Sequence, residues 1–308
     1  MNNNSSKLLT YIKLSLVIIV WGSNFIVAKY LTKQADIFTV AFLRYIISAV
    51  LLVIFAYRKF GKHGFKQTRE NIIVLFLLGF VGIFLYNILF FGASSLIAAN
   101  DVSILFAFTP AISILLGAIF LKYRVEPFAY VGVIIALIAT IGVLSAVDPR
   151  CHHYICLNSL LHLSFGHVVS LMAVICMAAY GVINKKAAQL KLDPVTITMY
   201  SASFGAILLF ISFLLFGHGF APIFKLDWKF WLGLIYIAVV CTVIAYIWYS
   251  QAIEQLGVGP ASVFLNAIPF DTILLGMIFL GTGITLRELF FGILIVVGVI
   301  ITNIAQSK

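Results

Sequence analysis

Two stretches of the sequence share one pattern: Pro110-Ala-Ile-Ser-Ile-Leu-Leu-Gly-Ala-Ile-Phe-Leu121 and Pro269-Phe-Asp-Thr-Ile-Leu-Leu-Gly-Met-Ile-Phe-Leu280. Over 114–121 and 273–280, seven of eight residues are identical. Apolar segments often resemble one another by chance, but in this pair the proline and the glycine are also equally spaced. The sequence therefore predicts an internal repeat.

The composition around these stretches is that of a membrane protein. The chain has 308 residues, of which 63% are hydrophobic and only 10% are charged, and its mean hydropathy is +1.14. A soluble domain carries roughly 25% charged residues. With so little charge the chain could not cover its surface against water, whereas apolar side chains are stable against lipid. We therefore expect an all-α integral membrane protein.

Ten stretches are long and apolar enough to cross a hydrocarbon core, which takes roughly 20 residues each. Charged or turn-forming residues separate them. The predicted spans are 11–33, 37–57, 72–92, 100–121, 128–147, 166–186, 195–216, 231–250, 260–280 and 287–305.

The positions of Lys and Arg predict the orientation. On one side of the predicted membrane lie 13 of them, and on the other side lie six, with Arg44 left out because it falls within a span. Cytoplasmic loops are the ones enriched in Lys and Arg. Both termini are therefore expected in the cytoplasm, with the chain in the cell inner (plasma) membrane. The net charge of +10 reflects these loops, and no basic stripe with aromatic residues indicates a nucleic-acid partner.

The two related stretches belong to the fourth and ninth spans, so they cross the membrane in opposite directions. This predicts two inverted five-helix repeats, 11–146 and 166–305, around a central cavity that opens to either side in turn. The segments 1–10, 147–165 and 306–308 are expected to be a cytoplasmic tail, a periplasmic connecting loop and a C-terminal tail. Pro110 and Pro269 each remove a backbone hydrogen bond, which could free carbonyl groups toward a cavity or simply kink the helix.

Short motifs on several spans add a family resemblance. They are Trp21-Gly-Ser-Asn-Phe25 followed by Lys29, Phe42-Leu-Arg-Tyr45, and Ala245-Tyr-Ile-Trp248. In this order, together with the repeat, they resemble the drug/metabolite transporter (DMT) superfamily, and within it the EamA-type carriers. The resemblance covers nearly the whole chain. It departs at Met177, where the family usually has Trp, and after Leu121 and Leu280, where a Gly-Glu pair is usual.

The resemblance implies a secondary transporter with ten helices and a central substrate cavity. Its cargo would be a small polar metabolite, such as an amino acid, an amine or a related solute. Transport would follow alternating access and could be coupled to protons, with export favoured over import. The implied partners are the small-molecule substrate, protons and membrane lipid, and the chain could form a homodimer.

Asp271 is the strongest candidate for a functional residue in transport, because an ionisable group inside a membrane span is energetically costly and usually functional. The corresponding position of the other repeat holds the apolar Ile112. Asp271 could bind and release protons or pair with a cationic substrate. Alternatively, it could form a structural salt bridge with Arg44 or Lys29.

Arg44 and Lys29 also leave two interpretations open. Arg44 matches the arginine of the family's second helix and could bind an anionic substrate, but an ion pair or a structural role that satisfies backbone carbonyls is the favoured interpretation. Lys29 lies near the end of its span. It could reach the membrane surface or line the cavity.

Polar and aromatic side chains recur on the spans that the family uses for its cavity. Buried polar groups need partners, and aromatic faces can hold a cation. Packing between helices or anchoring at the membrane surface is the alternative for each. The remaining candidates are Trp21, Asn24, Tyr86, Asn87, Tyr180, Asn184, Tyr246, Trp248 and Asn266.

The segment Cys151-His-His-Tyr-Ile-Cys156, with His162 and His167 after it, carries groups that could ligate a metal. Its spacing matches no standard zinc pattern, so we predict neither a metal nor a cofactor. In an oxidising periplasm, Cys151 and Cys156 could instead form a disulfide.

Two other classes of membrane protein compete with a transporter. An embedded enzyme, such as an acyltransferase or a lipid-phosphate phosphatase, needs acid, base or nucleophile groups gathered at one membrane face. The sequence shows no such cluster. A channel needs a lined pore or filter. An inverted repeat with one acid at mid-membrane fits a carrier better.

Overall fold

The computed structural model describes residues 3–122, 126–147, 164–280 and 285–306. All regular secondary structure in these ranges is helical. The α-helices are α1 (Asn3–Leu31), α2 (Ile37–Phe60), α3 (Arg69–Leu77), α4 (Tyr86–Leu96), α5 (Ala99–Leu105), α6 (Thr109–Leu121), α7 (Pro127–Val147), α9 (Phe165–Gln189), α10 (Pro194–Phe216), α11 (Trp228–Ala238), α12 (Ala245–Leu256), α13 (Val258–Val263), α14 (Ile268–Leu280) and α15 (Leu286–Gln306).

Six helical segments in these ranges are long and apolar enough to cross a membrane. They are Leu8–Leu31, Ile37–Phe60, Arg69–Leu96, Phe165–Gln189, Pro194–Phe216 and Trp228–Leu256. Shorter apolar helices lie at Ile112–Leu121, Pro127–Ala139, Ile268–Ile278 and Leu289–Thr302. A multi-pass membrane protein follows, while the total of ten spans remains a prediction.

Side chains that cap helices explain where several of the spans begin. Asp36 accepts the backbone N–H of Thr39 at 2.9 Å at the start of α2. Asp193 accepts the N–H of Val195 at 2.8 Å at the start of α10. These carboxylates satisfy backbone donors that have no partner within their own helix. Helices α2 and α10 therefore start directly after these two acids.

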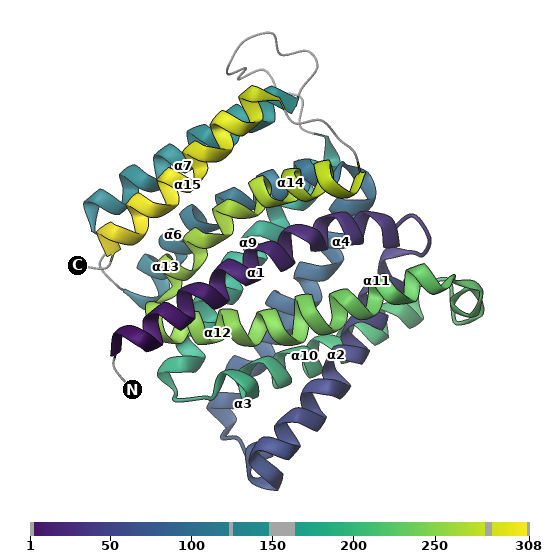
Figure 1. The fold of residues 1–308 in the computed structure, drawn as a ribbon. Coiled ribbons are helices and arrows are strands. Elements are labelled where there is room, and N and C mark those ends of the chain that lie inside the picture. Colours follow the sequence, from purple (N-terminus) through teal and green to yellow (C-terminus); the bar gives the residue numbers. More distant parts are fainter. Residues whose placement is uncertain (1–2, 123–125, 148–163, 281–284, 307–308) are drawn as a thin grey trace.

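The helices pack as one bundle in which α1 crosses the middle. Figure 1 shows α1 between α14 and α12, and its contacts with both helices are extensive. Helices α7 and α15 lie side by side along one edge of the bundle. The start of α1 and the end of α15 are on the same side of the bundle in this view.

Four irregular helical segments interrupt the helical spans, with one π-helical and one 3₁₀ segment in each half of the chain. Two are π-helical: η2 (Leu78–Leu85) joins α3 to α4, and η5 (Val239–Ile244) joins α11 to α12. The other two are 3₁₀-helical: η3 (Phe106–Phe108) precedes α6, and η6 (Phe264–Ala267) precedes α14. Both kinds often mark functional sites or hinges within helices. Two shorter 3₁₀ segments, η1 (Gly61–Phe65) and η4 (Ala221–Lys225), lie in the connections.

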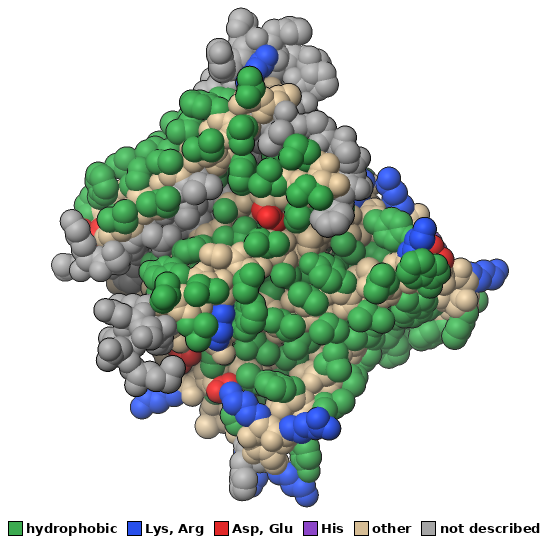
Figure 2. Space-filling view, viewed as in Figure 1, with side chains coloured by type: hydrophobic (Ala, Val, Ile, Leu, Met, Phe, Trp, Pro, Cys, Tyr) green, Lys and Arg blue, Asp and Glu red, His purple; other side chains and the backbone are tan. Residues whose placement is uncertain are grey.

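The outer surface is apolar where lipid is expected. Large hydrophobic side chains are exposed along the outward faces of the helices, among them Phe120 at 71% and Ile278 at 68%. In Figure 2, hydrophobic side chains cover the middle of the displayed face, and most Lys and Arg side chains lie toward its edges. This distribution suits a bilayer, whose core excludes charge and whose surfaces accept it.

The structure differs from the predicted stretches in two respects. Helix α1 begins at Asn3 rather than at residue 11, because the polar residues before the apolar run continue the same helix. The predicted spans 100–121 and 260–280 are each broken by a 3₁₀ segment just before Pro110 and Pro269. A proline lacks the backbone N–H that would continue the α-helical ladder at that point.

Candidate functional site

A narrow cavity lies at the centre of the bundle, between helices from both halves of the chain. Its lining residues are Trp21, Asn24, Phe25, Arg44, Tyr86, Phe106, Met177, Tyr246, Leu265 and Ile268. The volume open to the centre of a water molecule is about 10 Å³, which is room for about one water. The segments η3 and η6 contact each other beside it, so the two broken helices meet at the cavity.

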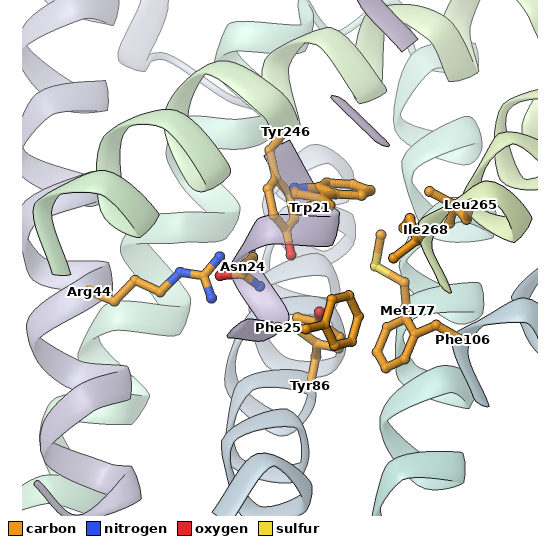
Figure 3. A pocket seen from close by; sticks show the side chains of 10 residues that line it. All are labelled: Trp21, Asn24, Phe25, Arg44, Tyr86, Phe106, Met177, Tyr246, Leu265 and Ile268. Carbon is orange, nitrogen blue, oxygen red and sulfur yellow. The ribbon is translucent and has the colours of Figure 1, made fainter. Parts of the chain in front are cut away.

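The cavity has a polar end and an apolar end. Figure 3 shows Arg44 reaching from α2 toward Asn24 on one side, while Met177, Leu265 and Ile268 lie on the other. The side-chain oxygen Oδ1 of Asn24 is buried and has no hydrogen-bond partner in this structure. Buried polar atoms nearly always have partners in folded proteins. An orphaned acceptor at this position indicates that something else completes the site.

Arg44 is the charged group of the site, and it is 1% exposed. Its Nε donates to Oγ1 of Thr242 at 2.8 Å, and one terminal nitrogen donates to Oδ1 of Asn87 at 3.4 Å. Its guanidinium carbon also lies 5.4 Å from the ring centre of Tyr45. Among the described residues, Arg44 forms no ion pair with an acidic side chain.

These contacts only partly offset the cost of burying the charge. Removing an ion from water costs several kcal/mol even after the protein relaxes. A hydrogen bond to a charged group contributes roughly 1.5–3 kcal/mol, and the longer of the two bonds from Arg44 contributes less. A cation–π contact adds about 0.5–2 kcal/mol. Arg44 therefore keeps N–H donors and a positive charge that no described carboxylate neutralises.

The π-helical segment η5 is held by polar side chains of the first half. The indole Nε1 of Trp21 donates to the carbonyl of Cys241 at 2.9 Å. The hydroxyl of Thr242, which accepts from Arg44, donates to the carbonyl of Ile237 at 2.8 Å. The wide turn of a π-helix disturbs the regular backbone ladder, and these two hydrogen bonds satisfy one carbonyl group within the segment and one just before it. The interruption in the helix thus holds two of the side chains that line the cavity, Trp21 and Arg44.

Asp271 does not line the cavity, although α14 supplies Ile268 one turn earlier. Its carboxylate packs directly against the backbone of Gly22 on α1, where any side chain would collide with it. Oδ2 of Asp271 is buried without a hydrogen-bond partner. Among the described residues, Asp271 forms no ion pair with Arg44 or Lys29. The salt bridge considered from the sequence is therefore absent in this structure.

Lys29 lies away from the cavity, at the end of α1. Its ammonium group donates to the carbonyl of Ile97 at 2.8 Å and to that of Ser95 at 3.3 Å. Those carbonyl groups lie at the C-terminal end of α4, where helices leave acceptors without partners. Lys29 therefore acts as a capping residue for α4.

Four other predicted residues, Tyr180, Asn184, Trp248 and Asn87, do not line the cavity. The ring centre of Tyr180 lies 5.4 Å from that of Tyr246. The amide of Asn184 donates to the hydroxyl of Ser250 at 2.8 Å. Trp248 is half-buried against the core, and Asn87 supports Arg44.

The side chain of Asn266 lies outside the described residues, as do Cys151, Cys156 and His162. No cluster of metal-ligating side chains occurs in the part of the chain that the structure describes.

Half of the cavity lining was not anticipated from the sequence. These residues are apolar: Phe25, Phe106, Met177, Leu265 and Ile268. Nothing in an apolar span distinguishes a cavity-facing residue from a lipid-facing one. The one signal was at Met177, which stands where the sequence resemblance leads one to expect a Trp.

Comparison with known proteins agrees with this geometry. The model of the EamA-like transporter family matches residues 8–145 and 164–304. The chain is 26% identical to "Uncharacterized transporter YyaM" of Bacillus subtilis over 94% of this chain and 92% of that protein. It is 26% identical to an "Uncharacterized transporter" of Archaeoglobus fulgidus, over 97% and 99% of the two chains.

One protein of known crystal structure has the same fold. It superposes with a TM-score of 0.73 at 17% sequence identity, and the match covers 95% of each chain. The relatives are transporters by name, and the family model covers both halves of the sequence. A helical membrane protein with a cavity between its halves, matched in this way over nearly its whole length, belongs to the EamA-like transporter family.

Proposed function

We propose that this protein is a secondary transporter that carries a small polar metabolite across the cell inner membrane by alternating access. Its cargo class is an amino acid, an amine or a related solute. The proposed direction is export, which the family resemblance favours over import, and both termini are placed in the cytoplasm. The start of α1 and the end of α15 lie on one side of the bundle (Figure 1), which supports the last point.

One observation carries this proposal: two broken helices, one from each half, meet at a cavity that both halves line. Helix α6 follows η3 and helix α14 follows η6, and each helix has its proline within the first two residues. Inverted repeats with discontinuous helices at their interface are typical of secondary transporters. We therefore propose ten spans arranged as two inverted repeats, 11–146 and 166–305.

The size of the cavity also supports alternating access. About 10 Å³ cannot hold a metabolite, so binding requires the two halves to separate on one side. The 3₁₀ and π-helical segments around the cavity supply places where helices can bend, because their backbone hydrogen bonds depart from the regular pattern. A water-filled channel would instead need a continuous lined pore.

Asp271 is the group proposed for proton coupling. The Oδ2 atom of its carboxylate, buried without a hydrogen-bond partner, lies in the contact between α1 and α14, which are helices of opposite halves. Neutralising that carboxylate changes the electrostatic cost of keeping it between the helices. Binding or releasing a proton there would therefore favour one arrangement of the halves over another.

Counterflow in proteoliposomes tests the transporter against its alternatives. Vesicles containing the purified full chain are loaded with an unlabelled metabolite mixture, and uptake of labelled amino acids and amines is measured. Saturable counterflow supports a carrier. Unsaturable current driven by voltage would indicate a channel, and chemical conversion of substrate without uptake would indicate an enzyme. Either of these outcomes would contradict the proposal.

A further inference from the structure

The structure assigns to the central cavity a cargo with a carboxylate group, held by Arg44, and with an apolar body. This inference rests on the proposed transport function and narrows its cargo class. It follows from a buried positive charge, an orphaned amide oxygen and an apolar wall that share one cavity.

The positive charge of Arg44 has no acidic partner in the part of the chain that the structure describes. Arg44 is 1% exposed, lines the cavity and forms no ion pair with an acid among the described residues. A guanidinium has five N–H donors, and the hydrogen bonds to Thr242 and Asn87 use two of them. Arginine binds a carboxylate through two parallel hydrogen bonds. The donors left over on Arg44 suit such a ligand.

Asn24 supplies the second, independent observation. It is 3% exposed, it lines the same cavity, and its Oδ1 has no partner. Figure 3 places its amide beside the guanidinium of Arg44. An amide can donate to a carboxylate oxygen or accept from an amino group on the neighbouring carbon. The polar end of the cavity thus matches the head group of an α-amino or α-unsubstituted carboxylic acid.

The cavity wall across from Arg44 favours a cargo molecule whose remaining part is apolar. Met177 and Ile268 lie on the far side of the cavity from Arg44 (Figure 3), and Phe106 completes that side with its ring. A single cation lines the cavity among the described residues, so a singly charged carboxylate fits better than a doubly charged phosphate. An amine without a carboxylate would bring a second positive charge next to Arg44, which is unfavourable at close range.

The test uses ligand sets that share one body and differ in the head group. The leucine and phenylalanine sets each contain the amino acid, its carboxamide, the decarboxylated amine, and the acid without its amino group. Inorganic phosphate is added as a further probe. Thermal stability of the purified full chain is measured with each compound, and each compound then competes in the counterflow assay.

We expect the carboxylates of at least one set to raise the melting temperature and to inhibit counterflow. The matching amines and carboxamides should bind at least tenfold more weakly. Equal effects from amines or amides, an effect of phosphate alone, or no effect from any carboxylate would overturn the inference. Saturable counterflow of solutes that lack a carboxylate would overturn it while leaving the proposed transport function intact.

Variants separate binding from folding. Arg44→Gln should bind the active carboxylate at least tenfold more weakly. Arg44→Lys should bind it with intermediate strength, because lysine keeps the positive charge but cannot make two parallel hydrogen bonds to one carboxylate. Arg58→Gln is the matched control, since it removes an exposed arginine from the end of the same helix, outside the cavity. Without ligand, Arg44→Gln should melt no lower than the wild type, because an isolated buried charge is removed. If Arg44→Gln bound the carboxylate normally, Arg44 would have no part in binding.

Discussion

Lys29 and Lys185 make the same contact in the two halves of the chain. Lys29 donates to the carbonyl of Ile97 at 2.8 Å, at the end of α4. Lys185 donates to the carbonyls of Ile253 at 3.2 Å and Glu254 at 3.1 Å, at the end of α12. In each half, the first long helix thus binds the C-terminal carbonyl groups of the helix that follows its π-helical segment.

The two contacts lie at opposite ends of the bundle. The residue next to the Lys185 contact, Gln255, accepts a hydrogen bond from Thr10 near the start of α1, whereas Lys29 lies near the end of that helix. At 1.5 Å per residue, Thr10 and Lys29 are about 28 Å apart along α1, close to the thickness of a hydrocarbon core. Inverted repeats would produce this arrangement.

We predict that the two lysine contacts hold opposite sides of the transporter closed. Replacing either lysine by methionine should remove about 1 kcal/mol of stabilisation from the closed arrangement on its own side. Lys29→Met and Lys185→Met should therefore shift accessibility in opposite directions.

The measurement uses a cysteine introduced by Phe106→Cys in a chain whose native cysteines are replaced by alanine. Membrane-impermeant maleimide is applied from each side of oriented vesicles, and the two lysine variants serve as controls for each other. A shift of both variants toward the same side would contradict the prediction.

Gly22 and Asp271 should be energetically coupled, because a methyl group on Gly22 would collide with the Asp271 carboxylate. Gly22→Ala should cost about 1–3 kcal/mol by overpacking. In the background Asp271→Ala, the same change should cost much less, since the colliding atoms are gone.

A double-mutant cycle of melting temperatures measures this coupling. Gly92→Ala is the matched control, because the nearest atom to its added methyl group is Val169 Cγ1 at 3.6 Å. Additive effects of Gly22→Ala and Asp271→Ala would show that the contact is absent.

Met177 should limit the size of the cavity. Met177→Trp places an indole in a space of about 10 Å³ and should reduce counterflow at least tenfold by filling the space that cargo needs. Met172→Trp on the same helix is the control, since Met172 is 50% exposed on the outer surface. Uptake rates in proteoliposomes should fall only for the first variant, and equal rates would place Met177 outside the transport path.

Asp271→Asn should remove the proposed proton coupling. The amide has nearly the same shape but cannot exchange a proton, so a pH gradient should no longer drive net transport, while counterflow without a gradient should persist. The measurement compares gradient-driven uptake with counterflow in the same vesicles, with Asp271→Glu as the variant that retains an acid. Unchanged gradient-driven uptake by Asp271→Asn would remove this residue from the mechanism.

The predicted orientation can be tested with epitope tags. Tags at the N-terminus, at the C-terminus and after Lys191 should be cytoplasmic, whereas a tag within 147–165 should be periplasmic. Accessibility to antibodies in intact and permeabilised spheroplasts distinguishes these positions. A periplasmic location of either terminus would contradict the predicted orientation, and termini on opposite sides would also rule out an even number of spans.

Much of the architecture could be predicted from local sequence. Apolar stretches of spanning length identify helices because lipid leaves no other way to satisfy the backbone. Asp36 and Asp193 lie just before the predicted spans 37–57 and 195–216, where a carboxylate can bind free N–H groups at a helix start. The matched residues around Pro110 and Pro269 indicated a repeat, and the structure places helix breaks directly before both prolines.

The composition of the site was decided by tertiary packing. Lipid-facing and cavity-facing residues in a span are equally apolar, so the sequence could not distinguish Met177, on the cavity wall, from Met172, on the outer surface. Nor could it show that Asp271 lies against Gly22 while Arg44 lies in the cavity without an acidic partner. Sequence alone determines that the chain crosses a membrane through several apolar helices. Which charges meet depends on how those helices rotate and pack, because burial is set by neighbours distant in the chain.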